Sequence, residues 1–323
     1  MMKRAIILCA MGIGVFVPFF SHAAQIYLDP PKGSYAPGVT FPVAVRIDTT
    51  ASQCINTAEV DISYPKDLMT AVAANDGNSI FSLWVKAPTI YPQYGLISFV
   101  GGLPGGYCGR VSGDPSLSNL LATIYFEFST STAANSSTIP QTAYITFLSS
   151  TKAMLNDGQG TDAPLSAAGA SYTQILTGSY APVDAWAQAI ENDTTPPEPF
   201  TVGVYRDPSL FNNQWFATFS TVDNQTGIDH YEVAEVPSAE LSQPASQWDW
   251  KRAVSPYLIA NQGLTDTIAV RAIDMAGNVR MEEYTPTSTA PAIPGTNLGM
   301  FPYIALIGIV GVALLQLILR IFL

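Results

Sequence analysis

FPVAVRID, residues 41–48, is the segment that decides the fold of this chain. Apolar side chains occupy every second position, which is the period expected of a β-strand with one face in a core. Residues 58–64 repeat the pattern, and Pro65 ends it. Because Pro42 cannot donate a backbone hydrogen bond, we expect the first of these strands to lie at a sheet edge at that position.

Around these two strands, the chain from Gln25 to about Thr177 continues as short strands separated by turns. The further predicted strands are 95–100, 120–128, 143–148 and 171–176. Segments such as 101–106 and 156–160 contain the glycines that tight turns require. No helical period of useful length interrupts them. The pattern predicts about eight or nine strands packed as a β-sandwich, in a domain that we place at residues 24–177.

Several short motifs in this domain resemble one family. They are YLDP at 27–30, GSY at 33–35, FPVAV at 41–45, LATIYF at 121–126 and LNDGQGTD at 155–162, and they look like cohesin domains. The resemblance covers most of the first domain and consists mainly of hydrophobic spacing and turns. It implies a jelly-roll β-sandwich related to carbohydrate-binding modules and without catalysis. The best-known members bind dockerin modules in assemblies that degrade polysaccharides, and they differ from this chain at Cys54 and Cys108.

A second β unit follows a break in the pattern. Residues 178–199 form a predicted linker, in which the prolines of DTTPPEP at 193–199 favour an extended connector. Residues 200–285 then have strand-like segments at the spacing of an immunoglobulin-like sandwich. These segments are 200–205, 214–221, 228–236, 256–260, 266–273 and 279–284. DNQTGI at 223–228 and RAIDMAGNV at 271–279 resemble bacterial Ig-like and fibronectin-type modules, which mostly serve as spacers.

The two ends of the chain predict export and membrane attachment. Residues 1–23 have the layout of a secretory signal peptide, with two basic residues, an apolar run and a small-residue cleavage site. Residues 300–323 form an apolar run long enough for a transmembrane helix, preceded by a Pro/Thr-rich stalk at 286–299. An uncleaved N-terminal anchor and a buried soluble C-terminal helix remain the alternatives. We expect a single-pass cell-surface protein whose C-terminus, with Arg320, is cytoplasmic.

Composition limits the partners. Only 12% of residues are charged, and 25 acidic against 14 basic residues leave a net charge of −11. This charge repels phosphate backbones, so no nucleic-acid partner is expected. After signal removal the only cysteines are Cys54 and Cys108, which predicts a disulfide in an exported protein. Two free thiols or a partial metal site are the alternatives. The single remaining histidine, His230, disfavours multi-histidine metal sites and a Ser-His-Asp triad.

Acidic residues of the second unit are a candidate cation site. Carboxylate and amide oxygens near one end of a sandwich can converge on Ca²⁺. The candidate ligands are Asp193, Asp223, Asp229, Asp274 and Asn278. Roles in turns and helix caps are the alternative. We expect no other cofactor.

Aromatic residues of the first domain are a candidate sugar platform, because flat rings stack on pyranose faces. The candidates are Trp84, Tyr91, Tyr94 and Tyr107. Core packing is the alternative for Trp84, and packing within the second unit is the expectation for Trp248 and Trp250.

These expectations favour a membrane-anchored, non-catalytic binding or scaffolding protein. Its cohesin-like domain would recognise a dockerin-like protein module or a polysaccharide, while the second sandwich and the stalk hold it away from the membrane. A carbohydrate-active enzyme, or an accessory subunit acting in polysaccharide breakdown, is the alternative. Such an enzyme would need two carboxyl groups about 5 to 10 Å apart in a cleft. A structural envelope protein that associates laterally is a third class.

Overall fold

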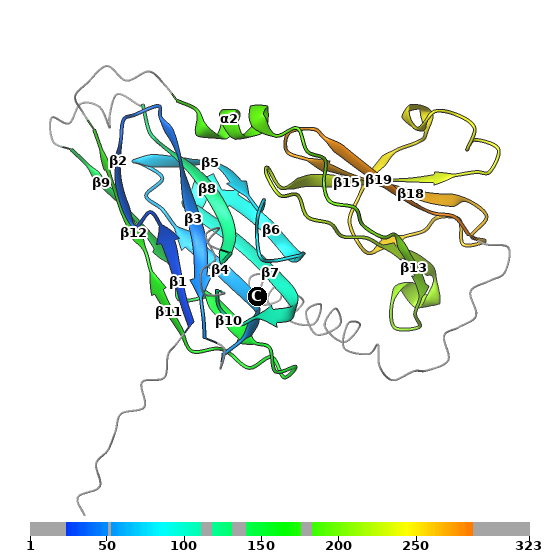
Figure 1. Cartoon of the computed structure of the whole chain (residues 1–323), viewed down its shortest axis with the longest axis horizontal. Coiled ribbons are helices and arrows are strands. Elements are labelled where there is room, and N and C mark those ends of the chain that lie inside the picture. Colours follow the sequence, from blue (N-terminus) through cyan, green and yellow to red (C-terminus); the bar gives the residue numbers. More distant parts are fainter. Residues whose placement is uncertain (1–23, 51–52, 111–117, 131–139, 176–182, 287–323) are drawn as a thin grey trace, which may run out of the picture.

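The computed structural model describes residues 24–50, 53–110, 118–130, 140–175 and 183–286 (Figure 1). These residues are mostly β, in two units separated by one short helix. The predicted signal peptide at 1–23, the anchor at 300–323 and nearly all of the stalk at 286–299 lie outside the described residues, so they stay predictions. Among the helices of the described residues, none has the length and apolar character needed to span a bilayer.

The first unit is built from two sheets. The five-stranded sheet has the order β11 (Leu165–Ala168), β1 (Ala24–Asp29), β3 (Thr40–Asp48), β8 (Leu120–Phe128) and β5 (Met69–Asn75). The seven-stranded sheet has the order β2 (Lys32–Tyr35), β12 (Ala170–Gln174), β9 (Thr142–Phe147), β4 (Ile55–Ser63), β7 (Leu96–Tyr107) and β6 (Leu83–Tyr91), with β10 (Lys152–Leu155) also paired to β4. A 3-10 turn, η1 (Pro92–Tyr94), joins β6 to β7.

A single apolar core lies between the two sheets. In β3, Val43, Val45 and Ile47 are buried, whereas Ala44 and Arg46 are not. Strand β4 buries Ala58, Val60 and Ile62 in the same way. The alternation in the sequence therefore marks the face that each strand contributes to the core, and the prediction of a β-sandwich is confirmed for this unit.

The expected edge at Pro42 holds only locally. Strand β3 is an interior strand, between β1 and β8. Its register with β1 runs from Ala44 to Asp48, however, so Pro42 lies beyond the end of β1 and is paired only with Tyr125 of β8. The proline thus occupies a position where no neighbour on the β1 side needs its missing N–H.

The segment predicted as an extended linker contains a helix, α2 (Ala185–Asn192). Asp184 caps its first turn by accepting hydrogen bonds from the N–H groups of Trp186 and Ala187. The Trp186 ring lies 4.9 Å from the Tyr125 ring of β8, measured between centroids. The sequence pattern did not indicate this helix, because it is short and none of its residues is buried.

The second unit has a three-stranded and a four-stranded sheet. The three-stranded sheet has the order β13 (Gly203–Arg206), β14 (Trp215–Thr218) and β17 (Tyr257–Leu258). The four-stranded sheet has the order β16 (Lys251–Ala253), β15 (Ile228–Val236), β18 (Thr267–Asp274) and β19 (Val279–Tyr284). Two 3-10 turns, η2 (Phe211–Asn213) and η3 (Ala245–Gln247), lie in its connections.

Several long segments were predicted, whereas the short strands and two longer ones, β5 and β6, were missed. Strands β8, β15 and β19 match the predicted ranges 120–128, 228–236 and 279–284. The described residues of the first unit form twelve strands rather than eight or nine, and strands such as β2, β10 and β11, four residues each, are too short to show a period. Trp248 and Trp250 pack against the four-stranded sheet as expected.

Candidate functional site

The predicted disulfide is present between Cys54 and Cys108, whose Cα atoms are 4.1 Å apart. It joins the start of β4 to the residue after β7. Gly109 follows at φ +97°, and a Cβ there would lie 2.5 Å from the Thr49 carbonyl oxygen. The disulfide and this close approach hold Arg110 beside the end of β3.

Arg110 belongs to a hydrogen-bonded network on the outer face of the five-stranded sheet. Its Nε and Nη2 donate to the two carboxylate oxygens of Asp48, at 3.0 and 3.1 Å. On the same strand as Asp48, Arg46 donates through Nε to Oδ2 of Asp29 on β1, at 3.1 Å. Asn119, which is fully buried, donates through Nδ2 to Asp48 Oδ1 and to the Tyr27 hydroxyl, both at 2.9 Å.

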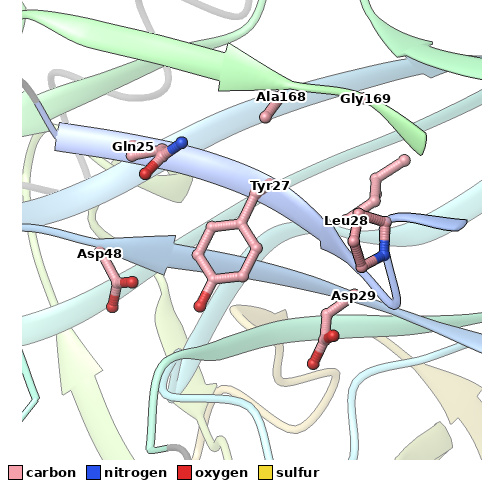
Figure 2. Close-up of a pocket in the computed structure, with 8 residues that line it drawn as sticks. Gln25, Tyr27, Leu28, Asp29, Asp48, Ala168 and Gly169 are labelled. Atoms are coloured by element: carbon pink, nitrogen blue, oxygen red, sulfur yellow. The ribbon is translucent and has the colours of Figure 1, made fainter.

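This network borders a shallow hollow of about 310 Å³, called the β1 hollow below (Figure 2). Its lining residues are Gln25, Tyr27, Leu28, Asp29, Pro31, Asp48, Ala168 and Gly169. Gln25, Tyr27 and Asp29 project outward because they alternate with buried residues in β1. Figure 2 shows the Tyr27 ring standing between Asp48 and Asp29. The residue opposite Tyr27 on β11 is Ala168, whose small side chain leaves room beside the ring.

A second, partly exposed surface is the outer face of the seven-stranded sheet, called the sheet face below. It is defined by Glu59, Asp61 and Ser63 of β4 and by their cross-strand partners Val100, Ser98 and Leu96 of β7. The face mixes charged, hydroxyl and aliphatic side chains in neighbouring rows.

Hydrogen bonds and ion pairs order the polar side chains of the sheet face. Lys86 Nζ donates to Ser98 Oγ at 2.8 Å. Ser150 Oγ donates to Asp61 Oδ2 at 2.6 Å, and Lys152 Nζ lies 3.1 Å from Glu59 Oε2. These contacts hold the polar groups in place around the aliphatic Leu96 and Val100.

The four predicted platform residues do not share one surface. Tyr107 is buried, and Trp84 makes edge-to-face contacts with Phe81 and Phe99. Tyr94 is 72% exposed at η1. Tyr91 lies under the Lys86 ammonium, 4.9 Å from its ring centroid. Trp84 and Tyr107 therefore serve the core, which is the alternative that the sequence had left open for Trp84.

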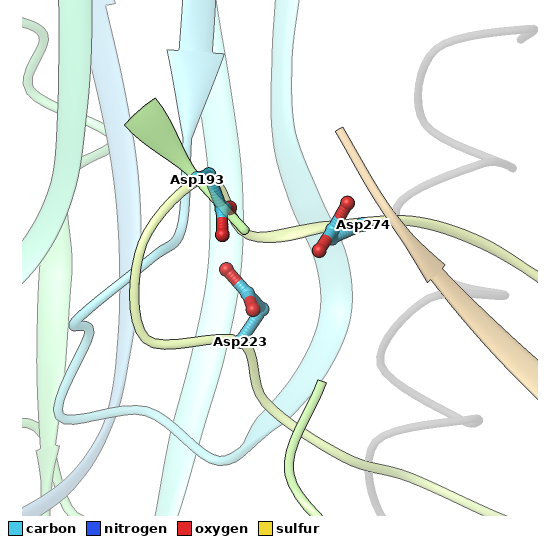
Figure 3. A group of neighbouring side chains, drawn as sticks. All are labelled: Asp193, Asp223 and Asp274. Atoms are coloured by element: carbon cyan, nitrogen blue, oxygen red, sulfur yellow. The ribbon is translucent and has the colours of Figure 1, made fainter. Parts of the chain in front are cut away.

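Three of the five predicted calcium ligands come together. Asp193 follows α2, Asp223 lies in the loop before β15, and Asp274 ends β18. One carboxylate oxygen of each lies within 4.8 Å of the others, and all three residues are buried. Figure 3 shows the carboxylates of Asp193 and Asp223 directed toward each other and that of Asp274 beside them.

Backbone and side-chain donors surround these three carboxylates. Asp193 accepts from the N–H groups of Thr195 and Thr226, at 3.0 and 3.1 Å. Asp223 Oδ1 accepts from the N–H of Gly227 at 2.9 Å. Burial raises the pKa of the Asp223 carboxyl, and the charges of Asp193 and Asp274 raise it further.

Asn278 joins the cluster, whereas Asp229 does not. Asn278 Nδ2 donates to Asp274 Oδ2 at 2.9 Å and to the Asp193 carbonyl oxygen at 3.1 Å. Asp229 instead forms a hydrogen bond through Oδ2 with Nδ1 of His230, and its Oδ1 lies 3.9 Å from Nη2 of Arg252. The oxygen-rich set of Asp193, Asp223 and Asp274 is of the kind that hard cations such as Ca²⁺ prefer. Calcium binding stays a prediction.

The cluster lies next to the junction between the two units. Asp76, in the loop after β5, accepts a hydrogen bond from the N–H of Ile228 at 3.2 Å. Asn75 Nδ2 donates to the Gln225 carbonyl oxygen at 3.0 Å. Burial raises the pKa of Asp76 to about 6, and the charge of Asp223 contributes. Residues far apart in the sequence thus form one acidic junction.

Sequence reasoning missed Asp76 and the β1 hollow. Asp76 is a lone acid in a loop, and nothing local indicates that Ile228 will face it. The alternating Gln25, Tyr27 and Asp29 did carry a signal, because polar residues at every second position mark the outer face of a strand. Their meeting with Asp48 and Arg110 depends on strand register and on the disulfide.

No family model matches the chain, and no curated protein matches it. Several solved structures, in contrast, are similar to part of the chain. A non-cellulosomal cohesin from Archaeoglobus fulgidus is 12% identical at a TM-score of 0.36, covering 47% of this chain and 91% of that one. A cohesin in a type I cohesin–dockerin complex from Clostridium thermocellum is 11% identical at a TM-score of 0.39, covering 47% of this chain and 93% of that one. The seventh ScaB type I cohesin from Pseudobacteroides cellulosolvens is 16% identical at a TM-score of 0.36, covering 49% of this chain and 96% of that one. Likenesses this low identify neither an activity nor a partner.

Proposed function

We propose that the chain is a non-catalytic recognition and scaffolding protein whose first unit binds a protein module through the sheet face. The observation that carries this proposal is the composition of that face. Val100 and Leu96 provide partly exposed aliphatic contact area, and polar groups fixed by hydrogen bonds, such as Ser98 and Asp61, lie between and beside them. Specific protein interfaces combine an apolar centre with a polar surround in this way.

A dockerin-like module is the partner that we propose for this surface. The sequence motifs of the first unit resemble cohesin domains, and dockerins are the partners of the cohesins in several of the similar solved structures.

The second unit completes the proposal as a spacer. Two facing β-sheets and the motifs at 223–228 and 271–279 support an Ig-like assignment. We propose that it separates the binding unit from a membrane in which residues 300–323 are anchored, with export directed by residues 1–23 and the C-terminus in the cytoplasm.

The carbohydrate-active enzyme alternative gains no support from the β1 hollow, where Asp29 and Asp48 are each paired with an arginine rather than left for proton transfer.

The test is binding of a panel of recombinant dockerin modules to the immobilised full chain. We expect at least one dockerin to bind, and we expect Val100→Arg to weaken its affinity about tenfold or more, because a buried charge would replace an apolar contact. Val72→Arg is the matched control, since Val72 is an exposed valine of β5 in the other sheet. The proposal fails if no dockerin binds, or if the two variants lose affinity equally.

A further inference from the structure

We propose that the β1 hollow binds a neutral sugar residue of an oligosaccharide. This inference is separate from the proposed recognition of a protein module, because it concerns the outer face of the other sheet of the first unit. It also differs from the predicted aromatic platform, whose residues lie on and around β6 and β7.

The size and shape of the hollow suit one small ring. Its volume of about 310 Å³ is at the lower end of the range for ligand sites. Ala168 and Gly169 form one side and are too small to fill the space beside the Tyr27 ring. An aromatic face of this kind can stack on the C–H face of a pyranose at little entropic cost.

The charges of the hollow are balanced in pairs. Asp48 accepts two hydrogen bonds from the Arg110 guanidinium, and Asp29 accepts one from Arg46. An anionic or cationic ligand would therefore meet no excess of opposite charge, whereas a ligand with many hydroxyl groups meets acceptors and donors of both kinds. This balance favours a neutral sugar over uronic acids, phosphates and basic peptides.

Hydrogen-bonding capacity remains beside these pairs. The Asp29 carboxylate accepts the hydrogen bond from Arg46 through Oδ2 only, and its side chain is 41% exposed. Its Oδ1 can therefore accept a hydrogen bond from a ligand. Gln25 is exposed on the same face, opposite Asp48 across the β1–β3 pair, and among the described residues its amide has no hydrogen bond. These groups can reach hydroxyls of a ring that rests on Tyr27.

The site is ordered before any ligand arrives. Buried Asn119 ties the Tyr27 hydroxyl to Asp48, and the disulfide at Cys108 restrains Arg110. Side chains that are already fixed lose little conformational entropy on binding. The network therefore has the properties of a preformed site for a polar ligand.

The experiment is titration calorimetry on the full chain with neutral hexasaccharides of glucose, xylose and mannose, and with hexagalacturonate as the anionic counterpart. A zwitterionic detergent is used, because glycosidic detergents would compete for the hollow. We expect at least one neutral hexasaccharide to bind with a Kd of millimolar or below, and hexagalacturonate to bind more weakly.

Variants locate the binding. Tyr27→Ala should weaken the affinity about tenfold through the lost ring contact, and Tyr27→Phe, which keeps the ring, should lose less. Gln25→Ala changes an exposed residue without touching the core and should weaken binding a few fold, about the effect of one hydrogen bond. Tyr94→Ala is the matched control, since it removes an exposed tyrosine of the predicted platform and should leave the Kd unchanged.

Several results would overturn the proposal. They are the absence of neutral-sugar binding at millimolar concentration, equal or tighter binding of hexagalacturonate, and equal effects of Tyr27→Ala and Tyr94→Ala. Val100→Arg on the sheet face should leave sugar binding intact. A failure of the sugar site is therefore distinguishable from a failure of module recognition.

Discussion

In the first unit one apolar core runs without interruption between the sheets, from Ile26 of β1 to Tyr172 of β12. The second unit divides its buried apolar side chains between two small clusters, one around Val233 and Val270 and the other around Ala234 and Val236. The second unit adds the buried polar cluster of Asp193, Asp223 and Asp274 at its junction with the first. Apolar burial therefore dominates the stability of the first unit, whereas the second depends more on how its buried charges are compensated.

The largest expected effect is the loss of a core aromatic from the first unit. Phe41 is fully buried and stacks on Tyr35, with ring centroids 3.7 Å apart. Phe41→Ala should lower the free energy of unfolding by about 3–5 kcal/mol through lost burial and the cavity left behind. Amide hydrogen exchange at increasing urea concentrations would measure the free energy of unfolding of each unit separately. If exchange accelerated equally in the second unit, the two units would share one cooperative core.

The disulfide should have the next largest effect, again confined to the first unit. Cys54 and Cys108 are 54 residues apart, which corresponds to about 4 kcal/mol in the chain-entropy model of loop closure. The double substitution Cys54→Ser with Cys108→Ser should lower the melting temperature of the first unit. Reduction of the unmodified chain with dithiothreitol should reproduce that shift, and a melting temperature that did not respond would contradict the prediction.

Calcium should act on the second unit alone. If Asp193, Asp223 and Asp274 bind the ion, calcium at one hundred times its Kd adds about 2.7 kcal/mol to the stability. Chelation with EDTA should then lower the melting temperature of the second unit, and Asp223→Asn should abolish the response. Asp229→Asn is the control, because Asp229 pairs with His230 outside the cluster. Melting curves identical with and without EDTA would end the calcium hypothesis.

A pH effect at Asp76, of about 2 kcal/mol between pH 4 and 6, is the smallest that we expect. Its pKa is about 6 when folded, against an ordinary value of 3.8, so the folded chain binds a proton that the unfolded chain has released. Stability should therefore fall as pH rises from about 4 to 6, by about 2 kcal/mol. Denaturant unfolding at each pH, with EDTA present to exclude metal effects, would measure the change.

Asp76→Asn tests whether that pH dependence comes from this carboxyl. The variant keeps a side-chain oxygen that can accept from the Ile228 N–H but has no proton to exchange in this range. Its stability should vary less between pH 4 and 6 than that of the unmodified chain. An unchanged profile would assign the dependence to other groups, such as Asp223, whose pKa is also raised.

The comparison between the units also shows how far local patterns reach. FPVAVRID predicted β3 because alternation reports a buried face regardless of which strand lies beside it. The two remaining cysteines predicted their own disulfide, since only one pairing exists within the first unit. Helix α2 escaped prediction, because eight residues of intermediate or exposed character show no strong helical period.

For the candidate sites, the sequence indicated which residue types could bind a ligand, but it did not indicate which of those residues lie next to one another. It proposed five calcium ligands, and the structure gathers three of them with Asn278 beside them, while Asp229 points elsewhere. Tyr107 and Trp84 have the chemistry of a sugar platform, but the packing of β6 and β7 turns both toward other side chains. Surface and core roles for an aromatic residue differ only in which face of its strand is covered.

The amino-acid sequence by itself determined that the first unit is a β-sandwich, the positions of many of the strands, and the disulfide between Cys54 and Cys108. It could do so because burial of one strand face leaves a local record at every second residue. Tertiary structure alone decided which outward residues meet: Tyr27 with Asp48 and Arg110 in the β1 hollow, and Asp76 with Ile228 at the junction. These meetings depend on the register between strands and on the docking of loops about 150 residues apart, and neither is encoded in a local repeat.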